Sequence, residues 1–571
     1  MPVPDVLIVG AGHNGLVAAN YLADAGLAVT VLERRGVIGG ATVTEELIPG
    51  FKSSSCSYVA GLLHPKVLGD LDLAGHGLQL YQTDVGDVNL LEDGRHLILW
   101  NELSATLRGL EELRSGESER FVALGLRLEQ FARFISPWIL RPPPELSEVL
   151  AAFEDAGQAD LFEEFFTLSV ADLLERYLEL DMLKGFLSFY ALVSAWGGPW
   201  TPGWSFLYGH HSIGEYEGRM GQYAFPRGGM GSVAAALAAR ARTRGVDIRV
   251  DAAVARVLVE RGRAVGVMLE TGEELRARAV ASSADPHRTF LGIVDAGDLP
   301  ADFRTDIEHF DMRGSMARVH IALDGLPDFV GMESGAGPHY RGLTLLGAEM
   351  ERFEQAWSAE RRGVIPDDFP VEFLTQSVHD DSLAPPGKHM LITGVQQLPL
   401  ELADGTWDDH KAAFTERVLD VMTRYAPKLR DHVIDTYTIT PLDLEREYGL
   451  TGGNIFHGAM TLGQVFGGRP ASGWSGYRSP LEGLYLCGSG AHPGGGVMGV
   501  PGHNAAHVVA ADLAGGGGPR EWGSGHQATA PGARGPLVER IMSRPRARKA
   551  LVRLARQPAL SPLVEKLSRR R

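Results

Sequence analysis

Residues 5–33 read DVLIVGAGHNGLVAANYLADAGLAVTVLE, and this stretch decides the fold. The apolar run 6–9 predicts a buried parallel strand, and residues 28–32 predict a second one. Between them, residues 16–25 have the small and apolar side chains of a helix that packs on a sheet. This order of strand, glycine-rich turn, helix and strand is typical of a dinucleotide-binding unit, so we expect an α/β protein with a Rossmann-like domain.

The turn of this unit has the spacing G-x-G-x-x-G. Gly10 permits the tight turn, Gly12 lets the backbone approach a pyrophosphate, and Gly15 lets the helix pack closely on the strand. Glu33, at the end of the second strand, can accept hydrogen bonds from ribose hydroxyls. NAD and FAD both use this motif. The residues predicted to contact the dinucleotide here are Gly10, Gly12, His13, Asn14, Gly15 and Glu33.

A glycine doublet follows the second strand in the segment RRGVIGGAT, residues 34–42. The arrangement Glu-x5-Gly-Gly resembles the extended fingerprint of the amine oxidase and phytoene desaturase superfamily of FAD enzymes. That resemblance implies FAD as the cofactor, with the doublet passing close to it. The arginine pair has two interpretations, a phosphate contact or solvated side chains. The further candidates for cofactor contact are Arg34, Gly39, Gly40 and Ala41.

A second glycine-rich segment, GLYLCGSGAHPGGGVMGVPGHNAAHV, covers residues 483–508. It predicts a short strand, a glycine-rich loop and a helix from about 502 to 514, whose N-terminus favours negative charge. It closely resembles the closing FAD motif of the phytoene dehydrogenase-related proteins. The resemblance implies that the amides of Gly488 and Ser489 meet the pyrophosphate, and that those of Val497, Met498 and Gly499 meet the flavin ring.

The resemblance continues through HHSIGE, GGMGSVAAALA, SLAPPGKHML and NIFHGAMTLGQ and therefore covers nearly the whole chain. It implies a discontinuous Rossmann-like FAD-binding domain and a mixed-sheet substrate domain with a helical insertion, of the amine oxidase and phytoene desaturase type. The backbone near Val254 would contact the adenosine. The expected parts are 1–100, 222–305 and 475–514 for FAD, 101–221 and 306–474 for substrate, 515–535 as a linker, and 536–571 as a basic amphipathic tail.

Three histidines are candidates for catalysis. His492 and His457 lie in segments that the resemblance places near the flavin, and His211 lies in an aromatic-rich stretch, residues 196–223. The aromatic side chains of that stretch form either an apolar substrate channel or an ordinary core. His210, His211 and Glu215 have the residue types of a metal site, but no further ligand cluster supports one, so we predict no metal.

The electron acceptor follows from a missing motif. The segment RGGMGS at 227–232 has the wrong glycine spacing for a second nucleotide site. We therefore expect oxygen or a quinone to take the electrons. Amine oxidation is disfavoured because the loop HPGGGVMG offers no aromatic residue for a cage beside the flavin, and because lysine is scarce. Lys184 and Lys388 are the main internal candidates for a lysine that binds water.

Charge is unevenly spread along the chain. The net charge is −17, although residues 534–571 are strongly basic. A body this acidic argues against nucleic acid as a partner. The tail, with apolar residues spaced as on one helix face, has three interpretations: contact with an anionic membrane, docking on the acidic body, or partial disorder. Because the sequence has two cysteines, no signal peptide and no transmembrane run, we expect a cytoplasmic protein. Association with a membrane through the basic tail is a further possibility.

These features together predict an FAD-dependent oxidoreductase acting on CH–CH or related C–H bonds. Hydride would pass to the flavin from an apolar substrate, an isoprenoid or a long-chain compound. A redox-neutral flavin-dependent isomerase, an amine oxidase and a flavin-bound interaction protein with little turnover are the alternatives. The substrate and the oligomeric state stay open, a homo-oligomer being one possibility.

Overall fold

A computed structural model describes residues 3–515 of the chain, and its first layer is a five-stranded parallel sheet. The strand of the opening motif is central, with Val6 paired to Val29 on one side and to Ala279 on the other. The apolar strands are almost completely buried, as in parallel sheets covered on both faces. In sheet order the strands are β11 (Asp247–Arg249), β2 (Val29–Leu32), β1 (Val6–Val9), β15 (Ala279–Ser282) and β21 (Leu484–Leu486).

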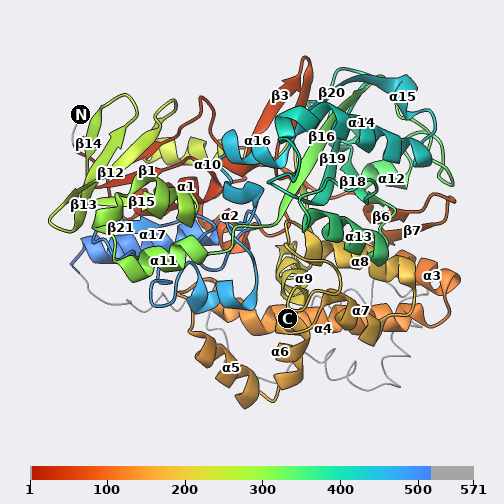
Figure 1. Cartoon of the computed structure of the whole chain (residues 1–571), viewed down its shortest axis with the longest axis horizontal. Helices are drawn as coiled ribbons and strands as arrows, with labels where there is room; N and C mark the ends of the chain where they lie inside the picture. The colour runs from red at the N-terminus through yellow and green to blue at the C-terminus, as the bar shows by residue number, and fades with distance from the viewer. Residues whose placement is uncertain (1–2, 516–571) are drawn as a thin grey trace.

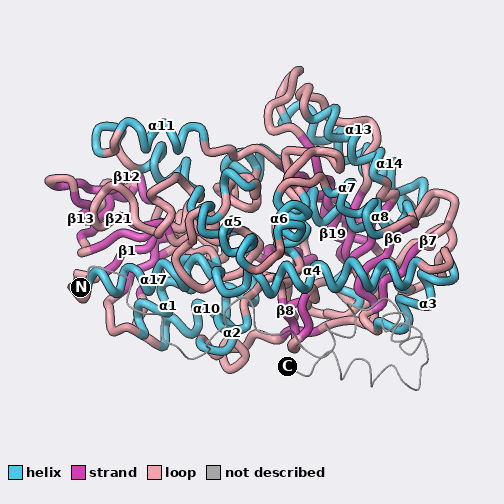
Figure 2. The backbone as a smooth tube through the Cα atoms, turned by 90° about the horizontal axis from the view of Figure 1, so that it is seen from below, coloured by secondary structure: helices cyan, strands magenta, loops and turns pink. Residues whose placement is uncertain are grey.

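Three helices pack side by side next to this sheet (Figure 2). They are α1 (His13–Asp24), α10 (Gly231–Thr243) and α17 (Val500–Leu513). The central helix α1 contacts both of the others, so helices from the beginning, middle and end of the chain share one layer. The predicted Rossmann-like domain is therefore confirmed, and it is assembled from distant segments.

A mixed seven-stranded sheet forms the second layer, beside the first (Figure 1). All its neighbouring strands are antiparallel except β17 and β6, which are parallel. In sheet order they are β20 (Val433–Ile439), β16 (Ser315–Leu323), β19 (His389–Leu398), β18 (Val371–Leu374), β17 (Leu343–Leu346), β6 (Val85–Leu90) and β7 (His96–Trp100).

The position of residues 85–100 differs from the sequence expectation. The sequence assigned residues 1–100 to the dinucleotide-binding part, whereas β6 and β7 pair with β17 in the second sheet. The difference has a simple cause, because alternating strand patterns specify which face is buried but not which sheet the strand joins. The linker beyond Gly515 and the basic tail 536–571 lie outside the described residues.

Residues 101–221 are largely helical, as predicted, and lie below the second sheet in Figure 1. Residues 170–192 form two helices that are separated at residues 178–180. The helices are α3 (Leu103–Leu113), α4 (Glu117–Ile139), α5 (Leu146–Asp155), α6 (Ala159–Phe166), α7 (Val170–Tyr177), α8 (Asp181–Leu192) and α9 (Ser205–His211).

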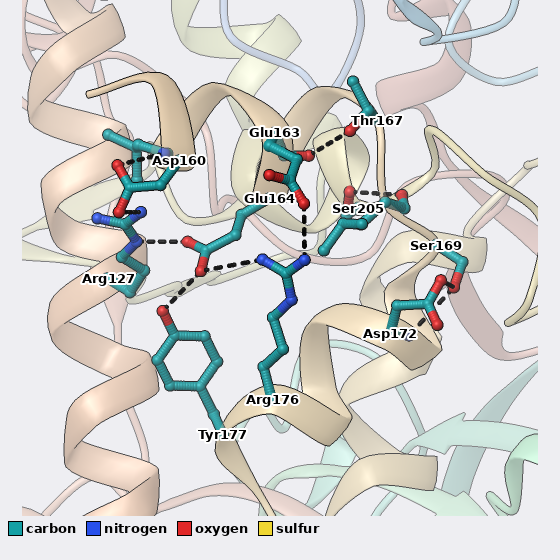
Figure 3. A network of polar contacts seen from close by, with 12 residues as sticks. Arg127, Asp160, Glu163, Glu164, Thr167, Ser169, Asp172, Arg176, Tyr177 and Ser205 are labelled. Atoms are coloured by element: carbon teal, nitrogen blue, oxygen red, sulfur yellow. Dashed lines mark hydrogen bonds and ion pairs between the residues drawn. The ribbon is translucent and has the colours of Figure 1, made fainter. Parts of the chain in front are cut away.

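A polar network joins α4, α6 and α7 (Figure 3). Glu164 accepts hydrogen bonds from Arg127 and from the Tyr177 hydroxyl, the latter at 3.0 Å. Arg127 also pairs with Asp160 at 2.8 Å, and Arg176 bonds to Glu163. Since the Glu164 and Arg127 side chains are only 8% and 13% exposed, this pair lies inside the helical region and fixes how its helices pack.

The remaining elements connect or cover the two sheets. Beside the first sheet lies an antiparallel set, β12 (Val254–Glu260), β13 (Arg263–Leu269) and β14 (Glu274–Arg276). The other strands form pairs, β3 (Thr44–Ile48) with β4 (Phe51–Ser54), β5 (Leu80–Tyr81) with β10 (Phe225–Pro226), and β8 (Glu215–Tyr216) with β9 (Arg219–Met220). The other α-helices are α2 (Pro65–Asp70), α11 (Ala301–His309), α12 (Pro338–Arg341), α13 (Met350–Glu360), α14 (Trp407–Tyr425), α15 (Leu429–His432) and α16 (Pro441–Arg446).

Candidate functional site

The two glycine-rich segments meet in space. The Asn14 side-chain amide donates to the Ser489 hydroxyl at 3.1 Å, a contact across 475 residues of sequence. The helices that follow the two segments pack closely, because a Cβ on Gly502 would lie 2.1 Å from the Asn14 carbonyl oxygen. The chain therefore brings its beginning and its end to a single site at the carboxyl edge of the parallel sheet, where ligands of such sheets bind.

Close backbone packing forms the cradle of this site. A Cβ on Gly15 would lie 2.2 Å from the Gly10 carbonyl oxygen, so only glycine fits at the start of α1. The glycine doublet lies against the same turn, since the Gly39 amide donates to the Ala11 carbonyl at 2.9 Å. A Cβ on Gly40 would approach the Gly12 Cα to 3.2 Å. Both predicted glycine motifs thus line one cradle beside a helix N-terminus.

Glu33 lies at the end of β2 and is 8% exposed. Its carboxylate oxygens accept one backbone amide each, from Ala11 at 2.8 Å and from Arg35 at 2.9 Å. Because a carboxylate offers about four acceptor positions, capacity remains for ribose hydroxyls. The Arg34 side chain is exposed, and its guanidinium donates to the carbonyls of Arg446 and Glu447, at 3.1 and 2.6 Å.

Several buried polar atoms at the cradle have no hydrogen-bond partner among residues 3–515. They are His13 Nε2, Asn14 Oδ1 and His457 Nδ1. Burial lowers the pKa of His13 to about 3, so its ring is neutral. Buried polar atoms in native proteins are almost always paired, and a bound polar ligand explains a cluster of unpaired ones. A glycine cradle, a helix N-terminus and unpaired polar groups fit the pyrophosphate and ribose of FAD.

The segment before β12 runs along the end of β2. The Ala252 amide donates to the Glu33 carbonyl at 2.8 Å, and the Ala253 carbonyl accepts from Glu270 at 2.8 Å. Val254, the predicted adenosine contact, is the first residue of β12 and is partly exposed. The structure thus places Val254 close to the Glu33 end of the cradle.

The glycine-rich loop between β21 and α17, residues 487–499, is called the C-terminal loop below. It ends where α17 begins, as the sequence predicts. Gly488 packs on the Ser283 backbone, and a Cβ there would lie 2.3 Å from its carbonyl oxygen. Val497 has a φ of 59° and Gly499, the N-cap of α17, a φ of 74°. A left-handed conformation is rare for a β-branched residue and is found mostly where function requires it. The Met498 carbonyl accepts from the His64 amide, which holds the turn in place.

An apolar cavity lies beside this loop. It has a volume of about 20 Å³, which is room for about one water molecule. Among the described residues that line it, two are polar, both histidines whose rings bond to backbone carbonyls: His210 Nε2 to Gly495 at 3.0 Å and His492 Nε2 to Trp138 at 2.9 Å. The lining residues are Ile135, Ile139, Phe206, His210, Ile213, Val465, Phe466, His492 and Pro493.

Both cavity histidines are neutral at physiological pH. Burial lowers the pKa of His210 to about 3 and that of His492 to about 4. Because a carbonyl can only accept, His492 carries its proton on Nε2. Its Nδ1 has no hydrogen-bond partner in the part of the chain that the structure describes, so its lone pair is free there. His492 can therefore accept a proton or a hydrogen bond beside the loop.

The other two candidate histidines lie elsewhere. His211 bonds through Nδ1 to the Leu207 carbonyl at 2.9 Å and lies between Phe456 and Tyr190, so the structure places His210 in the cavity and not His211. Burial lowers the pKa of His211 to about 4. Burial also lowers the pKa of His457. Among the charged groups near His457, Asp285 has the largest effect, and it lies on the dinucleotide side of the site.

Arg469 is a site residue that the sequence did not indicate. It is fully buried, and burial lowers its pKa to about 9. Its guanidinium donates to carbonyls of the 456–464 segment and, at 3.0 Å, to the Ser489 carbonyl. One side chain thus ties the segment around His457 to the C-terminal loop. A lone arginine outside any motif carries no sequence signal for this role.

Neither lysine candidate lies in the cavity. Lys184 pairs with Asp181 at 2.7 Å on α8, and Lys388 is exposed in a turn. No group of three or more potential metal ligands occurs within residues 3–515. In the same part of the chain, no helix is long and apolar enough to cross a membrane.

Fold and site together define an FAD-dependent oxidoreductase. The chain belongs to the flavin containing amine oxidoreductase family, whose model matches residues 152–500. An NAD(P)-binding Rossmann-like domain model matches residues 8–69, which contain the opening motif. The family confirms the predicted cofactor, FAD, and the predicted enzyme class.

Relatives of nearly full length include pyridine nucleotide-disulfide oxidoreductase domain-containing protein 2 of Mus musculus. It is 38% identical, over 90% of this chain and 94% of the mouse protein. A limonene dehydrogenase subunit of Castellaniella defragrans is 26% identical, over 89% and 95% of the two chains. The lycopene-forming phytoene desaturase of Pseudescherichia vulneris is 25% identical, over 86% and 96%.

Solved structures support the fold. Cyclohexylamine oxidase from Brevibacterium oxydans superposes with a TM-score of 0.56 at 20% identity, covering 90% of this chain and all of that chain. A putrescine oxidase variant gives 0.57 at 18% identity, covering 90% and 99%. At 20% sequence identity or less, this structural similarity supports the fold and no statement about function.

Proposed function

We propose that the chain is a dehydrogenase or desaturase that removes hydride from a C–H bond of an apolar substrate, an isoprenoid or a long-chain compound. The observation that carries the proposal is the character of the wall beside the C-terminal loop, which is aliphatic and aromatic apart from two neutral histidines; the cavity of about 20 Å³ there marks this wall and does not hold a whole substrate. Such a lining favours a hydrocarbon over a charged group. Relatives named for limonene and phytoene point in the same direction.

Each part of the site has a role in this reaction. When bound, FAD supplies the hydride acceptor. The cradle residues around Gly12, together with Ser489, hold the dinucleotide. The turn at Val497 and Gly499 directs the backbone amides at the start of α17 toward the flavin. Ile139 and Phe466 exclude water from the reacting bond. His492 Nδ1 is placed to take the proton that leaves the substrate, and its Nε2–H bond to Trp138 keeps the ring oriented.

Anaerobic mixing of the oxidised holoprotein with a substrate library tests the proposal. Isoprenoid or long-chain compounds should bleach the flavin absorbance, and titration with oxygen or a quinone should restore it. Bleaching by amines alone would favour an amine oxidase. Turnover only after prior reduction would favour an isomerase, and no response to any compound would favour an interaction protein.

A substitution that introduces a charged side chain into the cavity tests the same proposal. Ile213→Asp should slow bleaching by an apolar substrate at least about tenfold, equivalent to about 1.4 kcal/mol in the barrier. Ile434→Asp is the matched control, because Ile434 is 44% exposed on β20. Equal rates for both variants and the wild type would argue against this cavity as the substrate site.

We infer that the chain works in the cytoplasm and that its basic tail contacts anionic membranes. The inference rests on the tail composition, 12 Lys/Arg against 2 Asp/Glu in residues 534–571, and on Cys56 and Cys487, both free thiols. Deleting residues 536–571 should abolish sedimentation with phosphatidylserine vesicles. Unchanged sedimentation would contradict the membrane contact.

A further inference from the structure

A carboxyl group with two tyrosines lies inside the substrate region, away from the site described above. Asp87 is on β6, a strand with neighbours on both sides in the seven-stranded sheet. The Tyr190 hydroxyl donates to Asp87 Oδ1 at 2.8 Å, and the Tyr223 hydroxyl, which also donates to the Gly86 carbonyl, lies 3.2 Å from the same oxygen. The second oxygen, Oδ2, has no hydrogen-bond partner in the part of the chain that the structure describes, and Asp87 forms no ion pair there.

This group keeps part of its surface accessible although it lies among buried residues. Asp87, Tyr190 and Tyr223 are each partly exposed, although their neighbours Val88 and Ala224 are buried. Burial also raises the pKa of Asp87 to about 7, which a carboxyl on the outer surface would not show. Asp87 thus combines a partly exposed side chain with surroundings that desolvate its carboxyl group.

A line of contacts connects the cluster to the C-terminal loop. Phe456 packs on Gly495, where an added Cβ would lie 2.6 Å from its ring. The Phe456 ring is 5.9 Å from that of His211, which is 6.0 Å from the Tyr190 ring. These aromatic side chains extend from the loop to the carboxyl group.

The segment 58–62 connects the same two places. Leu62 packs on Gly496, and Gly61 lies beside the Tyr223 Cβ. Tyr58, four residues before Leu62, packs against the same hydrophobic cluster as Tyr190 and Tyr223. Four extended residues span at most about 14 Å, so one medium-length molecule can reach both the loop and the carboxyl group.

We propose that Asp87, Tyr190 and Tyr223 form a recognition site for a hydrogen-bond-donating end group, a hydroxyl or an ammonium, on an otherwise apolar substrate. This inference rests on the proposed function and adds a polar end to its substrate class. Asp87 Oδ2 is the acceptor, and the tyrosines fix the carboxyl in position. An analogue without the donor leaves this buried acceptor unpaired, so the site rejects it.

Binding of three octyl compounds to the holoprotein tests the proposal. The probes are 1-octanol, octylamine and octyl methyl ether, which shares the chain but cannot donate a hydrogen bond. Dissociation constants come from changes in the absorption spectrum of the bound flavin and from calorimetry. We expect the alcohol or the amine to bind at least about tenfold more tightly than the ether, and whichever binds tighter identifies the donor.

Two variants assign the preference to the cluster. Asp87→Ala should equalise the three constants. Asp84→Ala should keep the preference, because Asp84 is exposed and pairs with Arg341 on the outside. Equal binding of the three probes to the wild type, or a preference that survives in Asp87→Ala, would overturn the proposal.

Further variants cover the case in which Asp87→Ala does not fold. Tyr190→Phe and Tyr223→Phe keep the rings and remove one hydroxyl each, so each should weaken the preference at least about threefold. An unchanged preference in both would overturn the proposal. Because the probes need only bind, the result does not depend on flavin bleaching, and a failure of this site can be distinguished from a failure of the proposed function.

Discussion

At the scale of single residues, Arg469 shows how a site can depend on a side chain outside every motif. Its charge is buried without a carboxylate partner among the described residues, and it is compensated by backbone carbonyls instead. Those carbonyls belong to two segments, one around His457 and one around Ser489. Removing the donor would leave several buried acceptors unpaired at once, which is one of the costliest changes a protein interior can undergo.

Arg469→Met should therefore lower the free energy of unfolding by at least about 3 kcal/mol and reduce the FAD content of the purified protein. Arg469→Lys keeps the charge but has at most three donors, so its loss should be smaller. Urea unfolding and the flavin-to-protein absorbance ratio measure both effects. The control is Arg430→Met, since Arg430 pairs at the surface with Glu416 and Asp420. Equal losses at positions 469 and 430 would contradict the role of Arg469.

At the scale of elements, the helical region over the second sheet is held by contacts of unequal strength. Arg127 and Glu164 connect α4 to α6 from nearly buried positions. Arg176 and Glu163 connect α7 to α6 near the surface, with side chains 42% and 52% exposed. Removing one partner of a buried ion pair leaves the other charge buried and poorly compensated. An exposed pair contributes little to stability because water and salt screen it.

Glu164→Ala should accordingly cost about 1–3 kcal/mol in the free energy of unfolding, because Arg127 then keeps only the exposed Asp160 as a carboxylate partner among the described residues. The matched variant, Glu163→Ala, should cost less than about 1 kcal/mol, because its partner stays solvated. Thermal and urea unfolding of the holoprotein give both values. Losses of the same size would mean that the helices α4 and α6 are held by their apolar faces alone.

At the scale of the whole molecule, buried neutral histidines link stability to pH. Burial lowers their pKa values to about 3 or 4, whereas an unfolded histidine titrates near its ordinary value of 6.5. Between about pH 4 and 6.5 the unfolded chain binds more protons than the folded one, so stability falls as the pH is lowered through this window. The histidines concerned are His13, His64, His210, His211, His320, His339, His492 and His503.

The unfolding midpoint in guanidinium should therefore decrease from pH 6.5 to pH 4.5. Asp87, Glu360 and Glu372 act in the opposite direction, because burial raises their pKa values, but they are fewer. His320→Gln should flatten the dependence, whereas His309→Gln, at an exposed position, should leave it unchanged. A midpoint that is constant or rises toward low pH would show that the carboxyl groups dominate.

The sequence by itself determined the dinucleotide-binding unit and the cofactor. Strand, turn and helix around Gly10–Gly15 are specified by residues that are neighbours in the sequence. The glycines themselves mark the positions where two backbone segments must pack closely. The C-terminal loop carries a signal of the same kind. Local chemistry was therefore enough for the cradle, for α17 and for the parallel sheet.

Only the tertiary structure decided which residues meet across the chain. Asn14 bonds to Ser489, β6 joins the second sheet, His210 replaces His211 in the cavity, and Asp87 comes to lie beside Tyr190 and Tyr223. None of these pairings follows from spacing, because each depends on how whole elements pack and on which face of a helix or sheet is left for the interior.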